Sequence, residues 1–287
     1  MPAPDPSGLP PSLRSGHPLL GVGYAEPVRE RAFVRLDAGA ASDGAAPVAE
    51  EVPVALVYNG RPHAVMMTTP ADLEDFAVGF TLTEGIVAGA GDITGLAVSR
   101  HAQGIEVTVT IPDAAAEQLV ERGRALIGRA GCGLCGVETI QQALRELPPV
   151  PSGPAIAIES LWRAERELPK YQTWNRQTGA LHAAAWTGAD GMPQVVREDV
   201  GRHNALDKVI GALAREGRPF DDGFMVITSR ASYELVQKCV AVGIRLLAAV
   251  SRPTGLAIGL AEASGLTLVA LLRGTSANVY ANGERLG

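Results

Sequence analysis

Two cysteines three positions apart stand in a glycine-rich hexapeptide, Gly-Cys-Gly-Leu-Cys-Gly, at residues 131–136. The hexapeptide directly precedes a segment with helical periodicity, and the backbone N–H groups at a helix N-terminus stabilise negative charge. We therefore expect Cys132 and Cys135 to populate the thiolate at neutral pH, on a loop that its glycines keep accessible. A thiolate can accept sulfur as a persulfide, and a nearby second thiol can receive or resolve it. The hexapeptide predicts a sulfur-transfer group with Cys132 and Cys135 as its catalytic residues.

Three other kinds of protein use the same Cys-x-x-Cys spacing. A structural zinc site needs two further ligands, and the chain offers only Cys239 and scattered histidines. A thioredoxin-type oxidoreductase begins with a βαβ unit that is missing here. A zinc nucleobase deaminase needs an upstream His-x-Glu and a proline before the first cysteine. No His-x-Glu occurs, and Gly131 stands where the proline should be, so zinc is the strongest alternative, with Cys239 expected to be buried in a helix.

Polar loops follow three of the strands expected near the C-terminus, at residues 228–233, 250–255 and 273–276. Ligands of open α/β sheets bind at the carboxyl ends of the strands, so these loops should meet at one edge. Serine, threonine and glycine donate hydrogen bonds to phosphate, and arginine can bind it bidentately. Serine and threonine are also ordinary helix N-caps, but three such loops favour a phosphate-bearing ligand. The candidate donors in the first two loops are Ser229, Arg230, Ser251 and Arg252.

A dense polar segment at residues 197–208 leads into an expected helix. Asp199, His203 and Asp207 recur at intervals of four, which places them on one helix face. A solvated, salt-bridged face would explain this pattern. A histidine between two carboxylates would equally suit a binding site. Both interpretations stay open, with His203 as a candidate ligand-binding residue.

The elements that position these residues follow from hydrophobic periodicity. Strands are expected at residues 182–186, 193–196, 223–228, 245–250 and 266–272, and helices at 200–216, 232–242 and 254–264. Short, nearly continuous apolar strands that alternate with helices predict a sheet covered on both faces, with parallel crossovers from residue 223 onward. The fold class expected for this part of the chain is α/β.

The N-terminal part is expected to hold a smaller α+β unit. A strand is expected at residues 31–36, a loop at 37–49, a hairpin at 52–68 that turns at Asn59-Gly60, a helix from about residue 72, a strand at 105–111 and a helix at 114–127. Residues 1–24 are rich in Pro, Ser and Gly and are expected to be disordered. The predicted division is an arm at 1–24, an α+β domain at 25–130 and an α/β domain at 131–287 that begins with the cysteine loop.

Composition restricts the class of partner. Lys and Arg number 25 against 31 Asp and Glu, and this net charge of −6 argues against a nucleic-acid binder. No stretch reaches about 18 uncharged apolar residues, so no membrane span is expected. Three cysteines are too few for a disulfide-stapled secreted domain. We expect a protein of the reducing cytoplasm.

Taken together, the motifs resemble the FdhD/NarQ family of formate dehydrogenase accessory sulfurtransferases. The resemblance runs from about residue 53 to residue 286. It rests on the cysteine hexapeptide and on the motifs at residues 54–60, 72–76, 178–182, 198–208 and 228–234. It implies a cytidine-deaminase-like, three-layer C-terminal domain and a homodimer.

The resemblance also implies a function. A cysteine desulfurase delivers sulfur as a persulfide on Cys132, with Cys135 assisting. The sulfur passes to the molybdenum of the bis-molybdopterin guanine dinucleotide cofactor, which is then inserted into the catalytic subunit of formate dehydrogenase. The cofactor is bound as a substrate, and the chain holds no metal of its own. The alternative is a non-catalytic chaperone that binds the cofactor and docks to the apoenzyme.

The cofactor contacts that the resemblance implies lie in one segment near the C-terminus. They are Leu271, Leu272, Arg273, Gly274, Thr275 and Ser276. The family often carries a further basic residue where this chain has Thr275-Ser276. Arg273 is therefore the side-chain charge expected in that segment.

Overall fold

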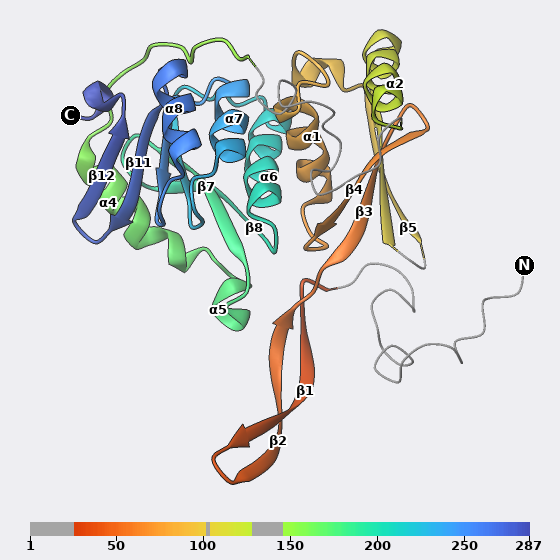
Figure 1. Ribbon diagram of the computed structural model, residues 1–287, viewed down its shortest axis with the longest axis vertical. Helices are drawn as coiled ribbons and strands as arrows, with labels where there is room; N and C mark the ends of the chain where they lie inside the picture. Colours follow the sequence, from red (N-terminus) through yellow and green to blue (C-terminus); the bar gives the residue numbers. More distant parts are fainter. Residues whose placement is uncertain (1–25, 102–103, 128–145) are drawn as a thin grey trace, which may run out of the picture.

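The computed structural model describes residues 26–101, 104–127 and 146–287. Within these residues the strands form a large C-terminal sheet, a smaller N-terminal sheet and a two-stranded hairpin that projects from the body (Figure 1). The expected arm at residues 1–24, the cysteine hexapeptide and the expected boundary at residue 131 lie outside the described residues.

The C-terminal sheet has six strands in the order β12-β11-β10-β9-β7-β8. They are β7 (His182–Gly188), β8 (Pro193–Asp199), β9 (Gly223–Ile227), β10 (Leu246–Ala249), β11 (Thr267–Arg273) and β12 (Ser276–Ala281). β9, β10 and β11 run parallel, whereas β7, β8 and β12 are antiparallel to their neighbours. The parallel crossovers expected from residue 223 onward are confirmed. The periodicity misses β12, because its mostly exposed residues form no apolar run.

Helices cover both faces of this sheet. α6 (Arg202–Arg215), α7 (Tyr233–Ala241) and α8 (Gly255–Ser264) pack on one face, and α4 (Ile158–Glu167) packs on the other. Met225 of β9 lies in the cluster with α6–α8, and its neighbour Phe224 lies in the cluster with α4, as the alternation of a strand requires. α4 is not among the expected helices, although Ile158, Leu161 and Trp162 recur at helical spacing and contribute to the cluster on this face. None of the helices among the described residues has the length and apolar character needed to cross a membrane.

The N-terminal sheet has the strand order β4-β3-β6-β5. Its strands and helices are β3 (Val52–Tyr58), β4 (Arg61–Thr68), α1 (Leu73–Thr83), β5 (Gly95–His101), β6 (Gly104–Thr110) and α2 (Asp113–Ile127). The hairpin of β3 and β4 turns at Asn59 and Gly60, where φ is 47° and 77°, so the expected turn is confirmed. The Asn59 side chain also donates to the Ile111 carbonyl oxygen over 2.9 Å and accepts from the Ile111 N–H over 3.0 Å. The turn is thereby tied to the end of β6.

The projecting hairpin, β1 (Val28–Asp37) and β2 (Ala40–Ala49), corrects the expectation for residues 37–49. The sequence predicts a loop there because Ala, Gly, Ser and Asp have low strand propensity. In the structure every residue of β2 pairs with one of β1, from Val28↔Ala49 to Asp37↔Ala40. The conformation of β2 therefore comes from its backbone hydrogen bonds to β1, and not from the strand propensity of its side chains.

A close crossing of α1 and α6 joins the N-terminal unit to the C-terminal unit (Figure 1). Gly79 of α1 and Gly211 of α6 lie at the crossing, where a Cβ atom on either residue would come within 1.8 Å of a backbone oxygen of the other helix. Only glycine allows backbones to approach so closely. One cluster of buried apolar residues runs continuously through this crossing, and Cys239 lies in it with no exposed surface, as expected.

Replacement of Gly79 by alanine should open this crossing. The added methyl group would overlap the Asp207 carbonyl group, so we expect the free energy of unfolding to fall by about 3 kcal/mol. Gly259 in α8 is the matched control, because a Cβ atom there meets nothing within 4 Å, and Gly259→Ala should stabilise the protein by up to about 1 kcal/mol. Denaturant unfolding measures both variants. Equal stability of Gly79→Ala and the wild type would contradict the tight crossing.

Candidate functional site

The structure describes the part of the candidate site that lies at one edge of the C-terminal sheet. Cys132 and Cys135 lie outside the described residues. We call the other part the carboxyl edge, meaning the loops at residues 228–232 and 250–254 together with the segment 271–276. Within the described residues, no group of three or more His, Cys, Asp or Glu side chains could hold a metal ion. That finding does not bear on the zinc alternative, which depends on the cysteine pair.

Main-chain hydrogen bonds bring the segments of the carboxyl edge together. The Ala231 N–H donates to the Arg252 carbonyl oxygen over 3.1 Å, and the Thr254 N–H donates to the Ala231 carbonyl oxygen over 3.0 Å. The Leu271 N–H donates to the Ser251 carbonyl oxygen over 3.1 Å. The loops that follow β9 and β10 are therefore held against each other and against the end of β11. Their expected meeting at one edge is confirmed.

The segment at residues 271–276 differs from the other two, because it turns back into a strand. Arg273 pairs with Ser276 across a two-residue turn, in which Gly274 has a φ of 59°. Leu271 has a φ of 55°, and the register of the ladder shifts between residues 270 and 273. The Leu272 side chain is buried in the cluster with α4, whereas the residues from Arg273 to Ser276 are exposed. The exposed turn, and not Leu272, offers donor groups at this edge.

The donors predicted in the two loops differ in how far they reach the surface. Ser229 is buried, and its hydroxyl donates to the Arg230 carbonyl oxygen over 3.2 Å. Arg230 and Arg252 are exposed, and Ser251 is half-buried. Helix capping explains Thr254, whose hydroxyl accepts a backbone N–H of α8. The two arginines are the groups in these loops that can reach an anion in solvent.

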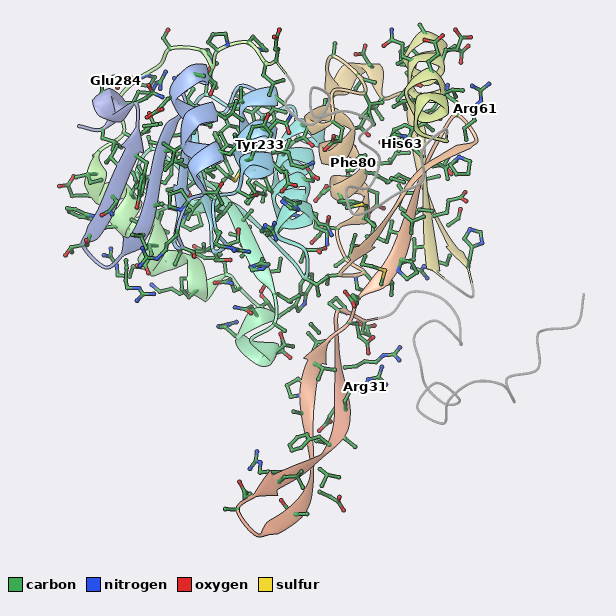
Figure 2. The ribbon with its side chains drawn as sticks, in the orientation of Figure 1. Arg31, Arg61, His63, Phe80, Tyr233 and Glu284 are labelled. Atoms are coloured by element: carbon green, nitrogen blue, oxygen red, sulfur yellow. The ribbon has the colours of Figure 1, made fainter. Side chains whose placement is uncertain are left out.

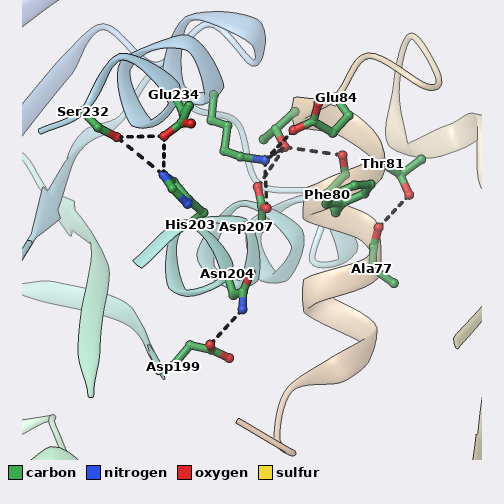
Figure 3. Close-up of polar contacts among 12 residues, drawn as sticks. Ala77, Phe80, Thr81, Glu84, Asp199, His203, Asn204, Asp207, Ser232 and Glu234 are labelled. Carbon is green, nitrogen blue, oxygen red and sulfur yellow. Dashed lines mark hydrogen bonds and ion pairs between the residues drawn. The ribbon is translucent and has the colours of Figure 1, made fainter. Parts of the chain in front are cut away.

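Ser232, His203 and Glu234 form a cluster at the same edge (Figure 3). The His203 Nε2 lies 2.8 Å from the Glu234 Oε2, and the Ser232 hydroxyl oxygen lies 3.5 Å from the same nitrogen. Burial, reinforced by the Arg202 guanidinium, lowers the pKa of His203 to about 4, against the opposing effect of Glu234. His203 is therefore neutral at physiological pH. The Glu234 carboxylate favours the tautomer that donates from Nε2.

Two further residues of this edge, His182 and Arg202, are not among the predicted site residues. β7 is antiparallel to β9, so its first residue, His182, lies at the edge where β9 ends. Burial and the positive charges of Arg202 and Arg230 lower the pKa of His182, with Asp199 opposing them. Both residues lie in motifs that carry the family resemblance, at 178–182 and 198–208, but those motifs do not place them at this edge. Only the strand order shows that the start of β7 and the start of α6 share it with the loops.

Glu198 holds in place the segment that precedes His182 and β7. Its buried carboxylate accepts from the N–H groups of Trp174 and Asn175 over 2.9 and 2.7 Å. The Asn175 Oδ1 accepts from the Leu181 N–H over 3.0 Å. Between them, the single-turn helix α5 (Asn175–Thr178) ends at Gly179 with a φ of 65°. The motifs at residues 178–182 and 198–208 thus include residues that hold the start of β7 in place.

Asp199 is an interior residue, not part of a solvated helix face. Asp199 and Lys208 have fully buried side chains, and the Oδ2 and Nζ atoms are 2.6 Å apart. Asp199 also accepts from the N–H groups of Thr69 and Gly201 over 3.0 and 2.7 Å. Lys208 donates to the Thr69 carbonyl oxygen over 3.0 Å. This ion pair ties α6 to the segment that precedes α1.

Asp207 is buried in a second ion pair, with Lys238 of α7. The Lys238 Nζ lies 2.9 Å from the Asp207 Oδ2 and 2.8 Å from the Glu84 Oε1. The Thr83 hydroxyl donates to the Asp207 Oδ1 over 2.8 Å (Figure 3 shows Asp207 between α1 and α7). Burial raises the pKa of Asp207 to about 6, against the opposing charge of Lys238. Of Asp199, His203 and Asp207, only His203 therefore lies at the carboxyl edge. The spacing of the three residues predicts a shared helix face, but it does not show which other elements pack against that face.

The fold and this edge define a class of protein. It is an α/β protein whose sheet gathers arginine, serine and histidine side chains at the carboxyl ends of its parallel strands, where the ligands of such sheets bind. Figure 2 draws the side chains on the ribbon and labels Tyr233, the first residue of α7, which follows the loop at residues 228–232.

Comparison with known proteins gives the family. The model of the FdhD/NarQ family matches residues 49–287. "Sulfur carrier protein FdhD" of Variovorax paradoxus (strain S110) is 50% identical over 83% of this chain and 86% of its own length. The protein of that name from Xanthomonas euvesicatoria pv. vesicatoria (strain 85-10) is 52% identical over 83% and 85%. The "Crystal structure of a putative formate dehydrogenase accessory protein from Desulfotalea psychrophila" has a TM-score of 0.74 at 26% identity, over 91% of this chain and 99% of that one. The chain belongs to the FdhD/NarQ family.

Lys208→Met should destabilise the protein strongly. It removes the partner of a fully buried carboxylate, so we expect the free energy of unfolding to fall by about 3–5 kcal/mol. Lys170→Met is the matched control, because Lys170 pairs with Glu167 at the surface with 63% of its side chain exposed, and it should leave the free energy of unfolding nearly unchanged. Chemical denaturation compares the two. Similar losses for both would contradict a special role of the buried pair.

The contribution of His203 to stability should depend on pH. Its folded-state pKa of about 4 lies below the ordinary value of 6.5, so the unfolded chain binds the proton more strongly. The contribution is therefore complete above pH 6.5 and lost as pH falls toward 4. Relative to His203→Gln, the wild type should lose about 1–2 kcal/mol between pH 7 and pH 4.5. Unfolding curves across this range test it, and a difference that stays constant with pH would contradict it.

Proposed function

We propose that this chain is a sulfurtransferase that takes up persulfide sulfur on Cys132 and passes it to the bis-molybdopterin guanine dinucleotide cofactor of formate dehydrogenase. The observation that carries this proposal is the Gly-Cys-Gly-Leu-Cys-Gly hexapeptide in a chain of the FdhD/NarQ family. Relatives at 50% and 52% identity are named sulfur carriers. Cys239 is not a candidate, because it is buried and burial raises the pKa of its thiol. Cys132 and Cys135 are therefore the candidates for sulfur transfer.

Uptake of sulfur is a thiol exchange. The Cys132 thiolate attacks the terminal sulfur of the donor's persulfide, a new S–S bond forms at Cys132, and the donor leaves as a thiolate. For release, the Cys135 thiolate attacks the Cys132 Sγ. The terminal sulfur then departs as sulfide, and the two cysteines supply its two electrons by closing a disulfide. The sulfide is passed to the bound cofactor, and a dithiol reductant of the cell then reopens the Cys132–Cys135 disulfide so that Cys132 can accept sulfur again.

The cofactor is cargo in this proposal, and the carboxyl edge receives its phosphate groups. Arg230 and Arg252 supply exposed positive charge, and the turn at residues 273–276 adds Arg273 and backbone donors. Ser229 and Ser251 line the loops between them, and His203 provides a neutral hydrogen-bonding group. A local concentration of donors of this kind suits a pyrophosphate even in a chain whose net charge is −6.

The partners in this proposal follow from the family. A cysteine desulfurase is the sulfur donor, and the catalytic subunit of formate dehydrogenase receives the finished cofactor. The structural neighbour, described as a formate dehydrogenase accessory protein, supports this assignment. The proposal includes action as a homodimer in the cytoplasm, with a C-terminal domain of the cytidine-deaminase-like kind.

Persulfide mapping tests the proposed chemistry. After incubation with a cysteine desulfurase and cysteine, mass spectrometry should find the mass of one added sulfur atom on the peptide that holds Cys132. Cys132→Ala should abolish this loading and reduce formate dehydrogenase activity in complemented cells to background, because in this proposal Cys135 attacks the loaded Cys132 and does not itself take up sulfur from the donor. Cys239→Ala is the matched control and should retain both.

Two results would contradict the proposal. If Cys132→Ala still loads sulfur and supports formate dehydrogenase, Cys132 is not the acceptor. If a variant lacking both Cys132 and Cys135 supports full activity, the chain acts as a non-catalytic cofactor chaperone. Metal analysis of the purified protein separates the zinc alternative, which requires stoichiometric zinc that is lost on Cys135→Ser.

A further inference from the structure

The Glu234 carboxylate lies among several hydrogen-bond donors at the carboxyl edge (Figure 3). Its Oε2 lies 2.8 Å from the His203 Nε2, 3.4 Å from the Ser232 hydroxyl oxygen and 3.9 Å from the Arg202 Nη2. One carboxylate oxygen is therefore shared among an imidazole, a hydroxyl and a guanidinium. These are the same donor types that bind phosphate oxygens.

Glu234 does not satisfy the hydrogen-bonding capacity of the Arg202 guanidinium. The distance to the Arg202 Nη2 exceeds that of a hydrogen bond, so the contact is electrostatic alone. The Arg202 Nε is buried and makes no hydrogen bond within the described part of the chain. The Glu234 carboxylate offsets the charge of the guanidinium but leaves this Nε–H group without an acceptor. A phosphate, with several oxygens, can accept from Arg202 and Ser232 at the same time.

The cluster is also open enough to exchange its anion. The Glu234 side chain is 49% exposed, and those of Arg202 and His203 are 33% and 28% exposed. Ion pairs with this exposure contribute little to stability, so displacement of the carboxylate costs little. The buried pair of Asp199 and Lys208 on the same helix is the contrasting case, because neither side chain is exposed.

We propose that Glu234 is a placeholder anion, which pairs with Arg202, His203 and Ser232 while the edge is empty and is displaced by a phosphate group of the incoming nucleotide. This inference rests on the proposed function and adds a specificity-determining residue to it. The placeholder excludes weakly bound single-charge anions, because only a ligand with several phosphate oxygens gains more than the carboxylate gives up. The edge thereby selects a nucleoside diphosphate group over simple anions.

Titration of the full-length protein with GDP tests the placeholder. Glu234→Gln keeps the size of the side chain and removes its charge, so GDP should bind about fivefold more tightly. Glu262→Gln is the matched control, because Glu262 is an exposed residue near the end of α8, at the opposite edge of the sheet. It removes the same charge and should leave the affinity for GDP unchanged. Calorimetry gives the affinities, and thermal melts check that each variant is folded.

A double-mutant cycle separates displacement from a general charge effect. Arg202→Gln should weaken GDP binding, and adding Glu234→Gln to it should then improve binding by less than about twofold, because the carboxylate no longer competes for the guanidinium. If the wild type binds GDP and Glu234→Gln binds it equally or more weakly, the placeholder is wrong and the proposed cofactor edge stands. If the wild type does not bind GDP, the proposed cofactor edge fails and the placeholder fails with it.

Discussion

The fixed position of α6 against α1 is the constraint on which the carboxyl edge depends. Two glycines bring the helix backbones into contact, and two buried lysines neutralise Asp199 and Asp207 on the α6 side of the joint. A buried charge that loses its partner costs several kcal/mol, so sliding or rotation of α6 would separate both pairs at once. α6 also begins at the edge with Arg202 and His203. The N-terminal unit therefore sets the position of residues that belong to the C-terminal sheet.

The carboxyl edge combines several positive charges with one partly offsetting carboxylate. Arg202, Arg230 and Arg252 bring positive charge to a chain that is acidic overall, and burial keeps His203 neutral among them. A second positive charge at His203 would repel Arg202, which is one reason for its lowered pKa. Glu234 offsets part of the remaining charge without closing the edge to solvent. This combination favours an exchangeable anion over a permanent internal salt bridge.

The proposed function joins this edge to the cysteine hexapeptide in a chain of the FdhD/NarQ family. In the proposed division of labour, the sheet holds the phosphate end of a large cofactor and the glycine-rich loop brings the sulfur. Precise placement of a nucleotide needs a stiff edge, whereas a group that visits a donor and then an acceptor needs freedom.

The sequence by itself determined the Cys-x-x-Cys spacing, the family resemblance and most strands and helices of the C-terminal sheet, because motifs, hydrophobic periodicity and turn residues are local signals. Tertiary structure decided the rest. β2 exists because β1 pairs with it, and α4 is placed by the face of the sheet on which its apolar residues pack. Asp199 and Asp207 are interior and His203 is at the edge, although all three share one helix spacing. His182 and Arg202 join the edge only through strand order, since the groups that surround a side chain come from distant parts of the chain.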